Sequence, residues 1–143
     1  MTLCNMVVEA GAKNGTCPAD ATTVEYVTAR TSEEFEIVAA DGAATYAQEF
    51  KFDVSKLEPL VAAPHSPDNR KTAASVAGTK IDRVYIGSCT GGKTEDFMAA
   101  AKLMHAAGKQ VAVPTYLVPA TQKVWADVYA LPVPGCGGKT AAQ

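Results

Sequence analysis

The sequence lacks a long apolar run and a basic amino-terminal segment. None of its 143 residues lies in an uninterrupted stretch of about 18 apolar side chains, the length that a membrane-spanning helix needs. The first eleven residues contain no lysine or arginine, and Asn5 and Glu9 interrupt their apolar character. We therefore expect neither a secretory signal at this end nor an association with a membrane.

A strong charge of either sign is also lacking. The sequence has 13 lysines and arginines and 15 aspartates and glutamates, which gives a formal net charge of −2. This balance provides no general attraction to nucleic acid or to an anionic membrane. The hydrophobic fraction of 48% is ordinary for a globular protein, and a chain of this length can form one domain or parts of two.

Cysteine is scarce, and no two cysteines have the C-x-x-C spacing. The four are Cys4, Cys17, Cys89 and Cys136. Without an export signal we do not expect a disulfide framework. The simplest interpretation of any one of them is a small buried thiol in a reducing compartment.

The amino-terminal third predicts two short helices. Residues 2–10 have apolar side chains at helical spacing. Thr22 and Glu25 have the spacing of a capping box, which predicts a helix that begins there and runs to Ala29. Residues 31–47 mix acidic and alanine-rich portions, and we expect a loop.

Extended chain is predicted next. Residues 50–54 alternate apolar and polar side chains, which is typical of a half-buried strand. A second apolar run over 57–63 ends at a loop over 64–69, where two prolines exclude regular structure. Residues 71–79 predict a helical or irregular connector. We place a domain boundary here, with 1–72 and 73–143 in different domains.

A clearer pattern begins at Lys80. The predicted elements are a strand over 81–86, a glycine-rich loop over 87–92, a helix over 94–107, an irregular or edge strand over 111–117 and a helix over 121–130. Gly108 is placed to end the first of these helices. This order of elements predicts an α/β fold with a parallel sheet and covering helices.

Gly87–Thr94 matches the phosphate-loop pattern G-x-x-x-x-G-K-S/T and stands between a strand and a helix. In such loops, backbone N–H groups and a helix N-terminus face a polyphosphate. Glu95 and Asp96 follow at once, and in the first helical turn their carboxylates would repel a triphosphate. No apolar strand ending in Asp follows to supply a second magnesium ligand. A small nucleotide- or anion-binding module is the alternative hypothesis.

Cys89 gives the same loop a second interpretation. Thiolates are the ligands of iron–sulfur clusters, and neighbouring N–H groups bond to the sulfurs of the cluster. One cysteine does not make a cluster site, so spacing alone leaves a structural thiol as an open alternative.

Four ordered stretches resemble the aconitase superfamily. Residues 84–97, VYIGSCTGGKTEDF, resemble its first cluster-cysteine loop, and residues 1–11, MTLCNMVVEAG, resemble its helix that brings an Asn and a Glu to the active site. VPATQKVW at 118–125 and VPG at 133–135 are similar to further family stretches. Their order points to the isopropylmalate dehydratase (isopropylmalate isomerase) large-subunit branch more than to aconitase itself.

The resemblance implies a three-layer α/β/α fold and an iron–sulfur active site. Cys89 would be one of three cysteine ligands of a 4Fe-4S cluster, with Ser88 and Thr90 beside it. The family leaves the fourth iron free to act on substrate as a Lewis acid. Of the catalytic candidates, Glu9 would exchange a proton with bound hydroxyl or water, and Asn5, on the same helical face, would support the cluster.

The resemblance also implies that parts of the site are missing. The family's C-x-x-C, which supplies the other two ligands, is absent, and Cys136 stands where relatives usually have Ser, so we do not assign it as a ligand. Met1 matches an internal family position, so we expect a fragment that is inactive alone. A non-catalytic remnant that associates with other subunits is a further hypothesis.

A full-length relative would interconvert isopropylmalates by dehydration and rehydration, with homoaconitase- or aconitase-type hydro-lyase activity as the alternative. The implied partners are a small subunit that holds the swivelling domain and a small hydroxy acid substrate. The implied compartment is the cytoplasm, or an organelle stroma or matrix in a eukaryote.

Overall fold

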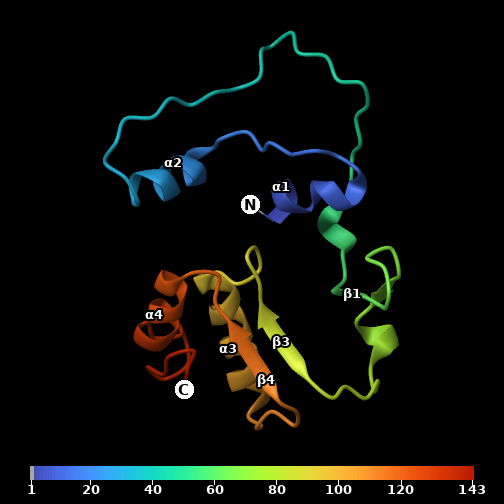
Figure 1. Cartoon of the computed structure of the whole chain (residues 1–143), viewed down its shortest axis with the longest axis vertical. Helices are drawn as coiled ribbons and strands as arrows, with labels where there is room; N and C mark the ends of the chain where they lie inside the picture. Colours follow the sequence, from blue (N-terminus) through green and yellow to red (C-terminus); the bar gives the residue numbers. More distant parts are fainter. Residues whose placement is uncertain (1) are drawn as a thin grey trace. The chain divides into compact units, whose positions relative to one another are not determined.

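The structure, a computed structural model, describes residues 2–143 (Figure 1). The chain divides into two units, one formed by Met6–Ser75 and the other by Val76–Gln143 with the residues up to Asn5. None of the helices within residues 2–143 has both the length and the apolar character needed to cross a membrane.

The first helix changes type along its length. α1 (Thr2–Met6) is α-helical, and it continues as the 3-10 helix η1 (Val7–Ala10). Gly11 ends it with a φ of 83°, and its N–H donates to the carbonyl of Val8 at 3.0 Å. The extent predicted from the sequence, residues 2–10, is confirmed, but the segment is not one continuous α-helix.

α2 (Ala21–Thr28) begins one residue earlier than predicted. Its N-cap is Asp20, whose carboxylate accepts hydrogen bonds from the N–H of Thr23 at 2.8 Å and from its hydroxyl at 2.9 Å. The predicted capping box of Thr22 and Glu25 is therefore wrong. Aspartate is among the strongest N-cap residues, and Asp20 stands two residues before Thr22.

The predicted strand over 50–54 is also wrong. Phe50 and Phe52 are exposed and stack on one another, with ring centroids 6.2 Å apart. Asp53 then turns the chain into the 3-10 helix η2 (Val54–Lys56), accepting from the N–H of Ser55 at 3.0 Å. Within the described residues this segment pairs with no strand, so its alternating pattern belongs to unpaired chain.

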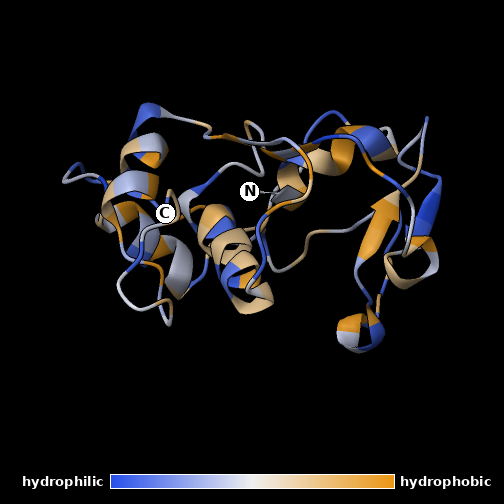
Figure 2. Ribbon diagram, turned by 90° about the horizontal axis from the view of Figure 1, so that it is seen from below, coloured by the Kyte–Doolittle hydropathy of each residue, from blue (hydrophilic) through white to orange (hydrophobic). Residues whose placement is uncertain are grey.

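A small antiparallel sheet completes this unit. β1 (Leu60–Ala62) pairs with β2 (Arg70–Thr72), with Val61 opposite Lys71. Figure 2 shows the apolar β1 beside the polar β2. The connector predicted over 71–79 therefore begins as a strand, and the 3-10 helix η3 (Ala74–Val76) follows it.

The second unit contains a parallel β–α–β–α arrangement, as the sequence predicts (Figure 1). Its elements are β3 (Val84–Gly87), α3 (Thr94–Ala107), β4 (Thr115–Val118) and α4 (Gln122–Ala130). Both strands start later than predicted. β4 begins only after Pro114, because proline has no N–H to donate to a neighbouring strand. β3 begins at Val84, whose N–H donates to the carbonyl of Pro114.

The core lies where α3, α4 and β3 meet. Phe97 is 1% exposed and packs with the buried Val124 and Val128, while Ile86 and Ala141 cover the cluster from the strand and the chain end. Val124 and Val128 are four residues apart, so they lie on the same face of α4, and Phe97 lies in the first turn of α3. Each fully buried side chain of this size contributes about 1.5–3 kcal/mol relative to exposure.

The opposite face of the β3–β4 sheet is exposed. Tyr85 and Tyr116 are register partners, so they lie on the same face, and both are exposed. The second unit is thus an α/β arrangement in which α3 packs on β3 and α4 packs on α3. A third layer remains a prediction, in line with the rule that parallel sheets are covered on both faces.

Candidate functional site

The loop between β3 and α3 is closely packed where it begins and ends. Gly87 has a φ of 126°, and a β-carbon there would stand against the carbonyl of Val118 and 3.2 Å from the ring of Phe97. A β-carbon on Gly92 would meet the backbone of Ser88 and lie 2.9 Å from the same Val118 carbonyl oxygen. Only glycine fits these two positions, so the loop is held against the end of β4.

Cys89 lies at the exposed part of this loop. Its side chain is not enclosed by the core, and Sγ is 3.8 Å from the hydroxyl oxygen of Thr90. A buried structural thiol, the alternative left open by spacing, is therefore not what the fold gives at this position. The sulfur is accessible to a ligand.

Ser88 and Thr90, predicted beside the cofactor, have different surroundings. The hydroxyl of Ser88 accepts from the N–H of Gly91 at 2.8 Å and of Thr90 at 3.3 Å, so it sets the shape of the loop. Thr90 is half-buried and contacts the sulfur. Both residues border Cys89, and a direct role at a cofactor remains a prediction.

The phosphate-loop hypothesis does not fit the hydrogen bonds of the loop. The N–H of Lys93 donates to the carboxylate of Asp96 at 3.0 Å, and the ammonium of Lys93 donates to the carbonyl of Cys89 at 3.1 Å. With Ser88 accepting from two further loop N–H groups, several donors that a phosphate would need are already bonded within the chain. The carboxylate at the helix start adds repulsion of an anion.

One residue near the loop was not recognised as a candidate from the sequence. Asp127 of α4 accepts a hydrogen bond from the hydroxyl of Thr94 at 2.9 Å and from the ammonium of Lys123 at 2.7 Å. The bond from Lys123, and then the bond from Thr94, lower the pKa of Asp127 below its usual value. The spacing of Lys123 and Asp127 signals a helical ion pair, but no local pattern signals the contact with Thr94.

Asn5 and Glu9 are both exposed, but the helix type changes between them. Asn5 lies in α1 and Glu9 in η1, where three residues make a turn. The argument that four residues place them on one α-helical face is therefore wrong in detail. The two residues also belong to different units, and their roles in a site remain predictions.

Residues 2–143 contain no cluster of three or more His, Cys, Asp or Glu side chains that could hold a metal ion. Cys136 is buried at 4% exposure, so its position fits a packing role. The role of Cys89 as one thiolate ligand of an iron–sulfur cluster remains a prediction. A complete cluster would need ligands from outside these residues.

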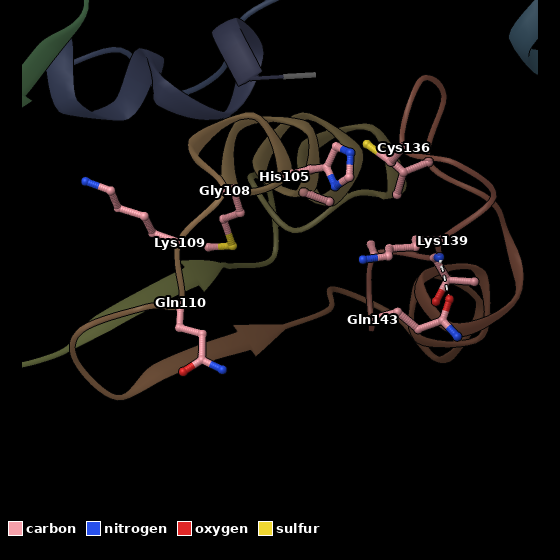
Figure 3. Close-up of a pocket in the computed structure, with 12 residues that line it drawn as sticks. His105, Gly108, Lys109, Gln110, Cys136, Lys139 and Gln143 are labelled. Atoms are coloured by element: carbon pink, nitrogen blue, oxygen red, sulfur yellow. Dashed lines mark hydrogen bonds between the residues drawn. The ribbon is translucent and has the colours of Figure 1, made fainter.

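A separate pocket of about 540 Å³ lies between the end of α3 and the carboxy-terminal loop. In Figure 3 the side chains of His105 and Cys136 point toward one another at this pocket, while Lys109 extends away. None of the predicted site residues lines it. The pocket and the Cys89 loop are therefore distinct features of the same unit.

Comparison with known proteins identifies the family. Residues 1–78 and 69–130 match the model of the Aconitase family (aconitate hydratase). The chain belongs to the aconitase family. This confirms the resemblance carried by the Cys89 loop and by the amino-terminal helix.

Several members of the aconitase family are similar to this chain. The chloroplastic 3-isopropylmalate dehydratase large subunit of Arabidopsis thaliana is 73% identical over 143 residues, which is all of this chain and 28% of that protein. The 3-isopropylmalate dehydratase large subunit of Moorella thermoacetica is 41% identical over 90% of this chain and 31% of that protein. A Methanosarcina mazei protein named probable methanogen homoaconitase large subunit is 43% identical over 85% of this chain and 31% of its own length. The chain thus spans less than a third of these relatives.

Proposed function

We propose that this chain is part of a 3-isopropylmalate dehydratase large subunit, which dehydrates and rehydrates isopropylmalate in leucine biosynthesis. The 73% identity to the Arabidopsis large subunit over the whole chain is the observation that supports this most strongly. The 43% identity to the Methanosarcina protein favours a homoaconitase as the second candidate. Both are hydro-lyases of small hydroxy acids.

Cys89 is the residue that we assign to the cofactor. Its exposed sulfur, on a loop held between β3 and α3, supports a role as one thiolate ligand of a 4Fe-4S cluster. In such an enzyme the cluster supplies a Lewis-acid iron. Ser88 keeps the loop in shape, and Thr90 places a hydroxyl beside the sulfur.

The amino-terminal helix supplies the other candidates. Glu9 is exposed and suited to exchanging a proton with the hydroxyl group of the substrate, and Asn5 would support the cluster. Residues 1–72 and 73–143 belong to two neighbouring three-layer α/β/α domains of the full-length subunit. The partner is a small subunit with the swivelling domain. The name of the Arabidopsis relative favours the chloroplast stroma as the compartment.

The first test examines the chain by itself. We expect no stable cluster and no turnover of isopropylmalate when the chain is incubated anaerobically with iron and sulfide, because one cysteine ligand does not hold a 4Fe-4S cluster. A stable cluster spectrum with hydratase turnover would contradict this expectation.

The second test restores the missing part of the protein. The 143 residues replace the matching region of the Arabidopsis large subunit, and the chimera is assembled with the Arabidopsis small subunit. We expect the chimera to isomerise isopropylmalate, and Glu9→Gln to abolish turnover while leaving iron content unchanged. A chimera that folds and binds iron but turns over homoaconitate rather than isopropylmalate would favour the second candidate.

A further inference from the structure

Asp127 links the start of α3 to α4 next to the Cys89 loop. The hydroxyl of Thr94, the first residue of α3, donates to Oδ2 of Asp127 at 2.9 Å across 33 residues of sequence. The side chain of Asp127 is 17% exposed, so water has limited access to this hydrogen bond. The bond therefore fixes the position at which α3 begins relative to α4.

The electrostatics of the contact favour its formation. The carboxylate of Asp127 lies at the amino-terminal end of α3, where the helix dipole favours a negative charge. Lys123, one turn earlier in α4, donates to the same carboxylate oxygen from an exposed position. Asp127 thus accepts one hydrogen bond from α3 and one from its own helix, and only the bond from Thr94 links the two helices.

The remaining hydrogen bonds connect Thr94 to Cys89. Lys93, adjacent to Thr94, donates from its ammonium to the carbonyl of Cys89 and from its N–H to Asp96 in the first turn of α3. The loop is also attached to the short connection between β4 and α4, because the N–H of Ala120 donates to the carbonyl of Gly92 at 2.9 Å. A shift in the start of α3 would therefore move the backbone that presents the thiol.

We propose that Asp127 is a positioning residue for the cluster-ligand loop: through Thr94 it fixes the start of α3 and hence the place of the Cys89 thiol. This inference rests on the proposed function, because the position of the thiol matters only if it binds iron. The attachment itself is a property of the metal-free chain and can be measured there.

Amide hydrogen exchange of the full metal-free chain, read by mass spectrometry, tests the attachment. In Asp127→Ala and in Thr94→Val we expect the amides of residues 88–93 to exchange roughly tenfold faster, since a hydrogen bond to a charged group is lost. Thr94→Ser keeps the hydroxyl and should retain the slow exchange. Lys123→Ala removes the exposed donor but keeps the Thr94 bond, so it is the matched control. It should leave residues 88–93 unchanged.

A general structural role would give a different result. The positioning role would be overturned if the amides of α3 and α4 exchanged faster by the same factor as those of residues 88–93. It would also be overturned if Thr94→Ser accelerated exchange in the loop as much as Thr94→Val does. Unchanged exchange of the loop amides in both Asp127→Ala and Thr94→Val would overturn it as well. Fluorescence of Trp125 checks that each variant is folded. Hydrogen exchange is measured without iron, so this result does not depend on the proposed function. If the loop amides exchange faster in the variants but a Cys89→Ser chimera keeps its full iron content, the attachment is established and the proposed function is contradicted.

Discussion

The carbonyl oxygen of Val118 lies 2.9 Å from the point where a β-carbon on Gly92 would stand. This contact joins the last residue of β4 to the end of the Cys89 loop. Real β-carbons essentially never approach other atoms within 3.0 Å, so the loop keeps this position only with glycine. The end of the candidate ligand loop is thus packed both against β4 and against the backbone of Ser88 within the loop.

Gly92→Ala should destabilise the second unit, and its neighbour provides the control. We expect a loss of about 1–3 kcal/mol in the free energy of unfolding, because the added methyl group meets backbone atoms that cannot move aside. A β-carbon on Gly91 would meet only the hydroxyl of Ser88 at 3.4 Å, so Gly91→Ala should stay within about 0.5 kcal/mol of the wild type. Urea unfolding followed by fluorescence of the single tryptophan, Trp125, measures both, and equal stability of the two variants would contradict the packing argument.

Phe97→Ala should produce a larger loss. Phe97 is the most deeply buried large side chain of the core, and truncation of a buried phenylalanine costs about 3–5 kcal/mol. Leu103 lies on the same helix and is 74% exposed, so Leu103→Ala should change stability by no more than about 0.5 kcal/mol. The same unfolding measurement separates the two, and a small effect of Phe97→Ala would place the core elsewhere.

The core could be predicted in part, because helical spacing identifies Phe97, Val124 and Val128. The same kind of spacing also predicts Trp125 and Tyr129 as core residues, and that prediction is wrong, since both are more than half exposed. The contact of Thr94 with Asp127 could not be predicted, since it joins residues 33 positions apart that have no shared pattern. The strand predicted at Phe50 failed for a related reason. Alternation predicts which side chains share a face, but a strand also needs a partner, and pairing is not a local property.

Thiol accessibility should differ among the cysteines of the native chain. Cys89 and Cys17 are exposed, whereas Cys136 is buried. Brief alkylation with iodoacetamide, quantified by mass spectrometry, should modify Cys136 at least roughly tenfold more slowly than Cys89, because its reaction requires local opening. The chain unfolded in urea, in which both cysteines should be labelled equally, is the reference. Comparable alkylation rates of Cys136 and Cys89 in the folded chain would contradict the packing of the carboxy-terminal loop.

Acid should weaken the link between α3 and α4. Asp127 has a pKa below the usual 3.8 in the folded chain, so its ionised form contributes stability above the unfolded pKa, and this contribution is lost as the pH falls through the folded pKa. Asp127→Asn should therefore be less stable than the wild type at neutral pH, and the difference should narrow below pH about 4. Asp82→Asn, which removes the carboxylate of an exposed aspartate in the same unit, is the matched control. Urea midpoints across the acid range test this, and a constant difference would contradict it.

Iron and sulfide content of the chimeric large subunit tests the ligand role of Cys89 most directly. The wild-type chimera should bind a 4Fe-4S cluster, and Cys89→Ser should lose it, while Cys17→Ser, a change at another exposed cysteine, should keep it. A Cys89→Ser chimera that is folded and retains the full iron and sulfide content would contradict the account.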